Sequence, residues 1–194
     1  MPEIDVNGNL FHYSERDGEG PLILMLCSTG LDSRQWRDML PLIEGRRSIC
    51  PHYLCYPKSG QWSGEGEIDS WTDYLASESL LLAEKGPVDI LGHSYGGFIG
   101  LMLAKNHPDK VRRMSLHEPT VWGCLQSTGR DDLKNEFGEV VETFFTEGLK
   151  PEDFLRDFVD YWNVPGTWDS MMEGRTVMWR ELQPKSLSEV RICL

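Results

Sequence analysis

Three absences restrict the function of this 194-residue chain before any motif is considered. It contains no apolar run long enough to span a membrane, and its first residues lack the basic start and apolar core of a signal peptide. Positive charge is scarce, with 19 Lys and Arg against 31 Asp and Glu, so clustered phosphate contacts are not available. We therefore expect a cytoplasmic protein that binds neither nucleic acid nor membrane and takes a small-molecule substrate.

The cysteines form no metal-binding or disulfide pattern. The chain has 5 cysteines, an odd number, and no two of them make a CxxC pair. Neither a disulfide framework nor a zinc site is predicted, and we expect no metal and no cofactor.

Strand-like and helix-like segments alternate through the first part of the chain. Asn7-Gly8-Asn9 predicts a hairpin turn, because Asn-Gly tolerates the positive φ of a tight turn. Continuous apolar runs predict buried strands. The predicted strands are 22–26, 48–50, 88–91 and 111–116, and the predicted helices are 36–43, 68–85 and 98–106. This order indicates an α/β fold with a mainly parallel central sheet and flanking helices.

The pattern changes after Pro119. Residues 131–181 show helical periodicity and are rich in aromatic residues and methionine, which predicts a helical cap packed over the sheet. The apolar run 190–194 indicates another strand. The expected domains are a core at 1–125, a cap or lid at 126–185, and the start of the next core strand at 186–194.

Gly92-His93-Ser94-Tyr95-Gly96 forms a G-x-S-x-G motif between a predicted strand and a predicted helix. In that context the serine stands exposed on a strained turn, and the flanking glycines allow strand and helix to approach closely. An activated serine also needs a base and donors for the oxyanion. The backbone N–H of Tyr95 is one candidate donor, and an amide of Thr29 or Ser28 in the loop 27–30 is the other.

These motifs resemble the α/β-hydrolase superfamily, and within it the serine-nucleophile branch of esterases and C–C hydrolases. Cys27-Ser28-Thr29-Gly30 stands where members have His-Gly-x-Gly, and Leu116-His117-Glu118-Pro119 resembles the strand end before the cap. The resemblance implies that Ser94 is the nucleophile of a serine hydrolase acting on small, rather apolar ester or acyl substrates. It further implies that the amides of Tyr95, Thr29 and Ser28 form the oxyanion hole and that the substrate contacts His93, Trp122 and Trp162.

The family places a catalytic histidine after its last strand, and none of the 5 histidines of this chain stands in such a position. We therefore expect a C-terminal truncation that leaves the chain itself weak or inactive. Glu118 fits the position of the triad acid in some members, and the alternative is a carboxylate that anchors the start of the cap. The rival function is a non-catalytic small-molecule binding protein of the same fold, which the replacement of family glycines by Ser28, Cys55 and Pro57 favours.

Overall fold

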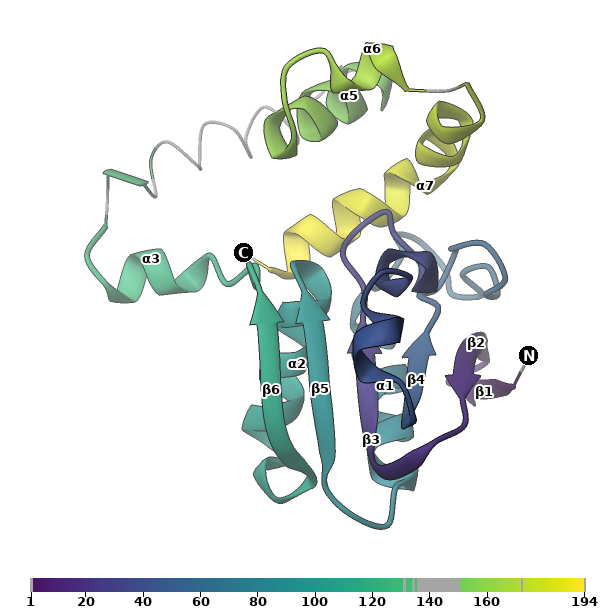
Figure 1. Ribbon diagram of the computed structural model, residues 1–194. Coiled ribbons are helices and arrows are strands. Elements are labelled where there is room, and N and C mark those ends of the chain that lie inside the picture. Colours follow the sequence, from purple (N-terminus) through teal and green to yellow (C-terminus); the bar gives the residue numbers. More distant parts are fainter. Residues whose placement is uncertain (1, 131, 134, 136–150, 172, 194) are drawn as a thin grey trace.

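A six-stranded sheet with the order β1-β2-β4-β3-β5-β6 forms the centre of the molecule (Figure 1). The computed structural model describes residues 2–130, 132–133, 135, 151–171 and 173–193. Strands β3, β4, β5 and β6 run parallel, whereas the hairpin β1–β2 joins the sheet antiparallel to β4. The mainly parallel α/β prediction is confirmed. The strands are β1 (Glu3–Val6), β2 (Asn9–Arg16), β3 (Glu19–Leu26), β4 (Arg46–Pro51), β5 (Val88–His93) and β6 (Val111–His117).

The central strand β3 is buried because helices cover both faces of the sheet. Its residues Leu22, Leu24 and Leu26 are almost completely inaccessible to solvent. Helices α1 (Trp71–Ala83) and α2 (Tyr95–Asn106) lie on one face, and two short 3₁₀ helices lie on the other (Figure 1). This coverage on both faces explains why β3 is a continuous apolar run, as the sequence predicted for a strand buried on both sides.

The helix predicted over residues 36–43 is instead two 3₁₀ helices, η1 (Ser33–Trp36) and η2 (Leu40–Ile43). Pro41 stands in the first turn of η2. Proline lacks the N–H that an α-helix would need at this position, and its ring clashes with the preceding turn. The predicted short helical stretch is therefore divided into two 3₁₀ helices and does not form one continuous α-helix.

The helical layer above the sheet covers the carboxyl ends of the parallel strands (Figure 1). It consists of α3 (Gly123–Ser127), α5 (Pro151–Trp162), α6 (Thr167–Ser170) and α7 (Glu173–Ile192). A small apolar core holds part of this layer together and comprises Leu155, Phe158, Val159, Trp168 and Trp179. The expected helical character is confirmed where the structure describes it, and residues 131, 134, 136–150 and 172 of the expected cap lie outside the described residues.

Residues 186–192 belong to helix α7, so the prediction of a new core strand at 186–194 is wrong. Helical spacing brings Lys185 and Glu189 onto one face, where they form an ion pair of 3.2 Å. Lys185 also pairs with the buried carboxylate of Asp73 on α1. In a strand the two residues would share a face but lie about 13 Å apart, at roughly 3.3 Å per residue, which is too far for this ion pair.

Strand β6 forms one edge of the sheet in the described part of the chain (Figure 1). Most of its residues are exposed, and Met114 keeps 41% of its surface accessible. The long helix α7 carries several charged residues, and no helix among the described residues has the length and apolar character needed to cross a membrane.

Candidate active site

Ser94 stands on a strained turn between β5 and α2. Its φ of 52° and ψ of −118° lie in a region that L-residues rarely adopt. The Ser94 N–H donates to the carbonyl of His117 at 3.0 Å, and its own carbonyl accepts from Phe98 at 3.0 Å. The backbone of the turn is thus held at both sides, and the half-buried serine lines a cavity.

The glycines around Ser94 are required by close backbone approaches. A Cβ on Gly96 would lie 2.3 Å from the carbonyl carbon and oxygen of Leu26 on β3. A Cβ on Gly92 would lie 2.9 Å from the oxygen of Gly96, and one on Gly97 would lie 2.9 Å from Pro119. The turn can form only with glycine at these positions, because any larger residue would clash with the neighbouring backbone. For this reason the G-x-S-x-G pattern predicts the turn from the sequence alone.

The amide of Tyr95 and the amide of Thr29 are the two candidate oxyanion donors. Tyr95 is the first residue of α2, where backbone N–H groups have no intrahelical acceptor. Thr29 lies in the loop after β3 and lines the same cavity as Ser94. Within the described residues, neither amide donates to another protein group. The pairing of these two amides in the oxyanion hole stays a prediction.

The amide of Ser28 differs from this pair. Its N–H donates to Oε1 of Gln35 at 3.0 Å, so it is not free to bind an oxyanion. The amide of Gly30, two residues further along the loop, donates to the hydroxyl of Tyr56. The expectation that Ser28 supplies an oxyanion donor is therefore not met in this structure, and Thr29 is the remaining candidate of the loop.

No histidine among the described residues is hydrogen-bonded to Ser94, so the structure contains no assembled triad in this part of the chain. Each histidine has another neighbour: His12 lies by Glu3, His52 by Ser14, His93 by Gln35, His107 by Glu78 and His117 by Glu118. Glu118 adopts a positive φ of 46° and lines the cavity. Its side chain is 73% exposed and lies 3.9 Å from that of His117. Its role as triad acid stays a prediction.

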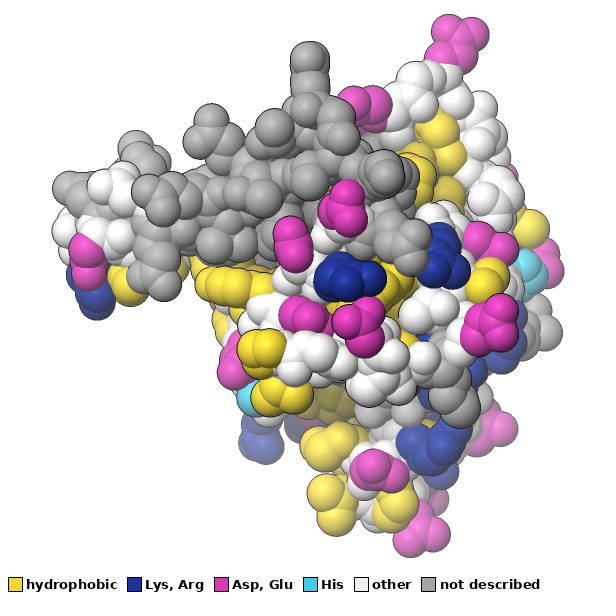
Figure 2. Space-filling view, turned by 90° about the horizontal axis from the view of Figure 1, so that it is seen from above, with side chains coloured by type: hydrophobic (Ala, Val, Ile, Leu, Met, Phe, Trp, Pro, Cys, Tyr) yellow, Lys and Arg dark blue, Asp and Glu magenta, His cyan; other side chains and the backbone are white. Residues whose placement is uncertain are grey.

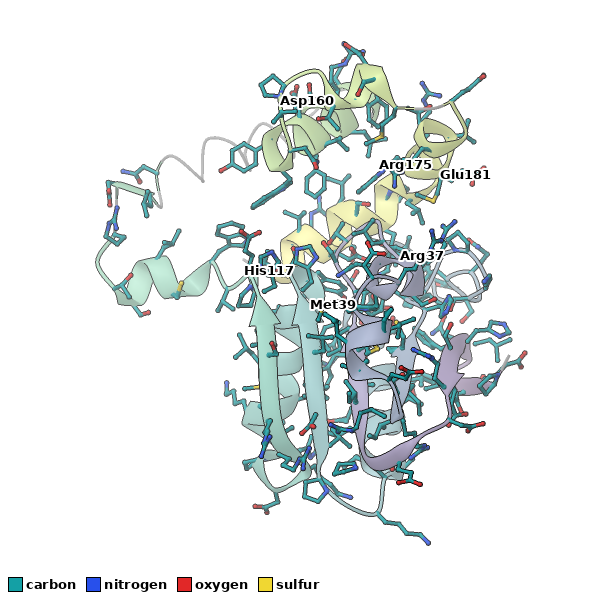
Figure 3. The ribbon with its side chains drawn as sticks, viewed as in Figure 1. Arg37, Met39, His117, Asp160, Arg175 and Glu181 are labelled. Atoms are coloured by element: carbon teal, nitrogen blue, oxygen red, sulfur yellow. The ribbon has the colours of Figure 1, made fainter. Side chains whose placement is uncertain are left out.

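His93, His117 and Glu118 place potential metal-ligand atoms within 4.8 Å of one another. His117 marks the upper end of β6, beneath the helical layer (Figure 3). However, Nδ1 of His93 already contacts the Gln35 amide at 3.1 Å. A nitrogen that accepts a hydrogen bond leaves the proton on Nε2, and a ligating histidine needs a free lone pair. The set is therefore a poor metal site.

A cavity of about 900 Å³ opens above Ser94, between the sheet and the helical layer. Trp122 and Trp162 both line it, with ring centroids 6.0 Å apart, as do His93 and several further apolar side chains. Seen from above, apolar side chains show between charged ones at this end of the molecule (Figure 2). The expected substrate-contacting residues are thus brought to one cavity with the serine.

Sequence reasoning missed polar residues of this cavity, among them Gln35, Tyr56 and Glu189. Tyr56 donates to Glu189 at 3.1 Å, and Glu189 is fully buried. Burial, opposed by Lys185, raises the pKa of the Glu189 carboxyl. No local sequence signal marks these residues, because Gln35 pairs with His93 across 58 residues and Tyr56 pairs with Glu189 across 133 residues.

Comparison with known proteins agrees with this geometry. The sequence profile described as alpha/beta hydrolase fold matches residues 21–164, well over half of the chain. The chain belongs to the α/β-hydrolase fold family. The solved structure of a hydrolase from Pseudomonas aeruginosa has a TM-score of 0.67 and 20% identity, covering 98% of this chain and 72% of that one. This likeness shows the same fold.

Two of the curated relatives are named as an esterase and a hydrolase. A pimeloyl-[acyl-carrier protein] methyl ester esterase from Aeromonas hydrophila is 29% identical over 101 residues, which are 52% of this chain and 38% of that protein. A 2-hydroxymuconate semialdehyde hydrolase from Pseudomonas sp. is 37% identical over 87 residues, which are 42% of this chain and 29% of that protein. The matches thus span less than half the length of these two relatives.

Proposed function

We propose that this chain carries the nucleophile of a serine hydrolase that cleaves small, rather apolar ester or acyl substrates. The observation that carries the proposal is the strained Ser94, at φ 52° on the glycine turn, which lines the same cavity as Thr29 and is followed by Tyr95 as the first residue of α2. The hydrolase names of the relatives support the same reaction class.

In the proposed reaction, Ser94 Oγ attacks the substrate carbonyl while a base removes the hydroxyl proton. The amides of Tyr95 and Thr29 stabilise the negative charge that develops on the carbonyl oxygen, helped by the N-terminus of α2. The bond to the leaving group then breaks, and the leaving group takes up the proton. Water hydrolyses the acyl-serine to release the acid and regenerate Ser94. A histidine outside the 194 residues is the proposed base.

The cavity lining supports a substrate with a substantial apolar part. Trp122, Trp162 and Phe158 supply aromatic surface to the same wall, with Phe158 and Trp162 centroids 6.4 Å apart. Arginines also line the cavity, among them Arg37 from the core and Arg175 from α7 above it (Figure 3). Their guanidinium groups can face a polar end of the substrate.

Labelling with a fluorophosphonate probe tests the proposal, because such probes bond covalently to activated serines. The parent protein in this test is the complete protein, which includes the proposed histidine. We expect Ser94→Ala to abolish labelling. Ser79→Ala is the matched control: Ser79 lies on α1, is exposed and donates to the Leu75 carbonyl, so its variant should label like the parent. Labelling that survives in Ser94→Ala would show that another residue is the nucleophile.

Two observations favour the second candidate, a non-catalytic binding protein of the same fold. None of the histidines in the described residues contacts Ser94, and the Ser28 amide is occupied by Gln35. On this hypothesis, the parent chain binds small apolar esters without being labelled and without turnover. Absence of labelling in the parent protein would overturn the hydrolase proposal and support this one.

A further inference from the structure

The side chain of Gln35 connects the loop after β3 to the nucleophile turn. Its Oε1 accepts from the Ser28 N–H at 3.0 Å, and its Nε2 lies 3.1 Å from Nδ1 of His93. A backbone N–H can only donate, so it determines which end of the Gln35 amide faces Ser28. The other end is then the NH₂ group, which donates to His93.

This arrangement determines the protonation of His93. Because Nδ1 accepts a hydrogen bond, a neutral ring carries its proton on Nε2. Burial, followed by the nearby His117, lowers the pKa of His93, and Glu118 opposes this shift. The ring is therefore neutral at neutral pH. His93 lines the cavity next to Ser94, and Nε2–H is the polar group it has left to offer.

We propose that His93 is a hydrogen-bond donor for substrate, through a fixed Nε2–H, and that Gln35 is the positioning residue that sets this tautomer. The donor would bind an oxygen acceptor close to the carbonyl that Ser94 attacks, such as a second carbonyl or carboxylate oxygen. This substrate preference rests on the proposed function, whereas the tautomer of His93 does not.

The same geometry removes two other roles for His93. The ring cannot serve as the base for Ser94, because neither nitrogen has a free lone pair: Nδ1 accepts from Gln35 and Nε2 holds the proton. It is equally unsuited to bind a metal ion in this tautomer. The remaining role for His93 is to donate a hydrogen bond through Nε2–H.

The first test reads the tautomer directly from the ring ¹⁵N shifts of the labelled chain, with His93→Ala to assign the signals. We expect Nε2–H in the parent protein and a titration below the ordinary pKa of about 6.5. Gln35→Glu keeps an acceptor for Ser28 but offers His93 a carboxylate, so it should move the proton to Nδ1 and raise the pKa. Gln35→Leu should leave a mixture of tautomers.

His107 provides an internal control in the same spectra, because it contacts Glu78 at 2.5 Å, away from the nucleophile turn. Its ring ¹⁵N signals should be the same in the parent protein and in both Gln35 variants. An Nδ1–H tautomer in the parent protein would overturn the proposal. Identical His93 signals in the parent, Gln35→Leu and Gln35→Glu would do so as well.

The second test measures how well two esters of similar shape protect Ser94 from the fluorophosphonate probe. Methyl pyruvate has a second carbonyl beside the ester, whereas methyl isobutyrate has a methyl group in its place. One hydrogen bond corresponds to a roughly five-fold preference for methyl pyruvate, which should be lost in His93→Phe. An equal preference in parent and variant would overturn the donor role. Failure of the probe to label Ser94 at all would count against the proposed function alone.

Discussion

The N–H of Ser94 donates to the carbonyl of His117 at 3.0 Å, which ties the nucleophile turn to the end of strand β6. The Thr120 N–H reaches the Ser94 carbonyl at 3.3 Å from the same segment. Both backbone groups of the serine are thus satisfied although its φ is positive. The surrounding structure keeps the residue in a conformation that it would leave if it were free.

Replacing Ser94 with glycine should stabilise the fold relative to replacement with alanine. Glycine adopts the observed φ of 52° without steric cost, whereas alanine retains the strain. We expect Ser94→Gly to unfold with a free energy about 1 kcal/mol higher than Ser94→Ala in urea titrations. Both variants should be inert to the serine probe. An alanine variant more stable than the glycine variant would mean that the turn is not strained.

Gly96→Ala should strongly destabilise the protein. The added Cβ would lie 2.3 Å from backbone atoms of Leu26, so strand β3 and helix α2 would have to separate. We expect a loss of about 3 kcal/mol or more, measured by chemical denaturation. Gly174→Ala is the matched control, because a Cβ there meets nothing within 4 Å and alanine favours the helix. Equal losses in the two variants would contradict the close approach at Gly96.

Glu189→Gln should change how stability depends on pH. Burial raises the pKa of Glu189, so the folded state holds its proton more tightly than the unfolded chain. The stability that this proton binding contributes is present below about pH 4.3 and is lost as pH rises through the raised pKa. Glutamine does not titrate, so the melting temperature of Glu189→Gln relative to the parent should increase from pH 4 to pH 8.

The matched control for this substitution is Glu181→Gln on the same helix, where Glu181 is exposed and points away from the core (Figure 3). Its melting temperature should follow that of the parent protein at every pH. If the difference between Glu189→Gln and the parent were constant across the range, the carboxyl of Glu189 would not be titrating differently in the folded state.

The exposed edge of β6 should promote association of the isolated chain, because its unpaired backbone groups can bind another strand. Met114 adds apolar surface to this edge strand, at 41% exposure. We expect Met114→Lys to reduce aggregation on heating, measured by light scattering. Val177→Lys, on helix α7 at 43% exposure, adds the same charge elsewhere. If both variants aggregate equally, net charge rather than the edge strand is responsible.

Much of the core could be predicted from the sequence because its signals are local. The Asn7-Gly8 turn has φ values of 53° and 80°, as a tight hairpin requires, and the apolar run of β3 is buried as expected. The position of Pro41 could have corrected the prediction of one helix at 36–43, since proline disrupts an α-helix wherever it stands in the interior.

Other features depend on partners that no local pattern reveals. Gln35 is 58 residues from His93, yet its amide decides both the use of the Ser28 N–H and the tautomer of the histidine. Only the fold brings these groups together. The sequence could therefore indicate an oxyanion loop but could not show which of its amides is free.

The sequence by itself determined the parallel core and the glycine turn that presents Ser94, because apolar periodicity and the absence of a Cβ act within a few residues. Only the tertiary structure decided the conformation of residues 186–192. Their apolar and polar residues are compatible with a strand or a helix. Lys185, however, is buried and pairs with the carboxylate of Asp73, 112 residues away, because a buried charge must be paired. The helical conformation allows this pairing, which cannot be deduced from the helix and strand propensities of residues 186–192.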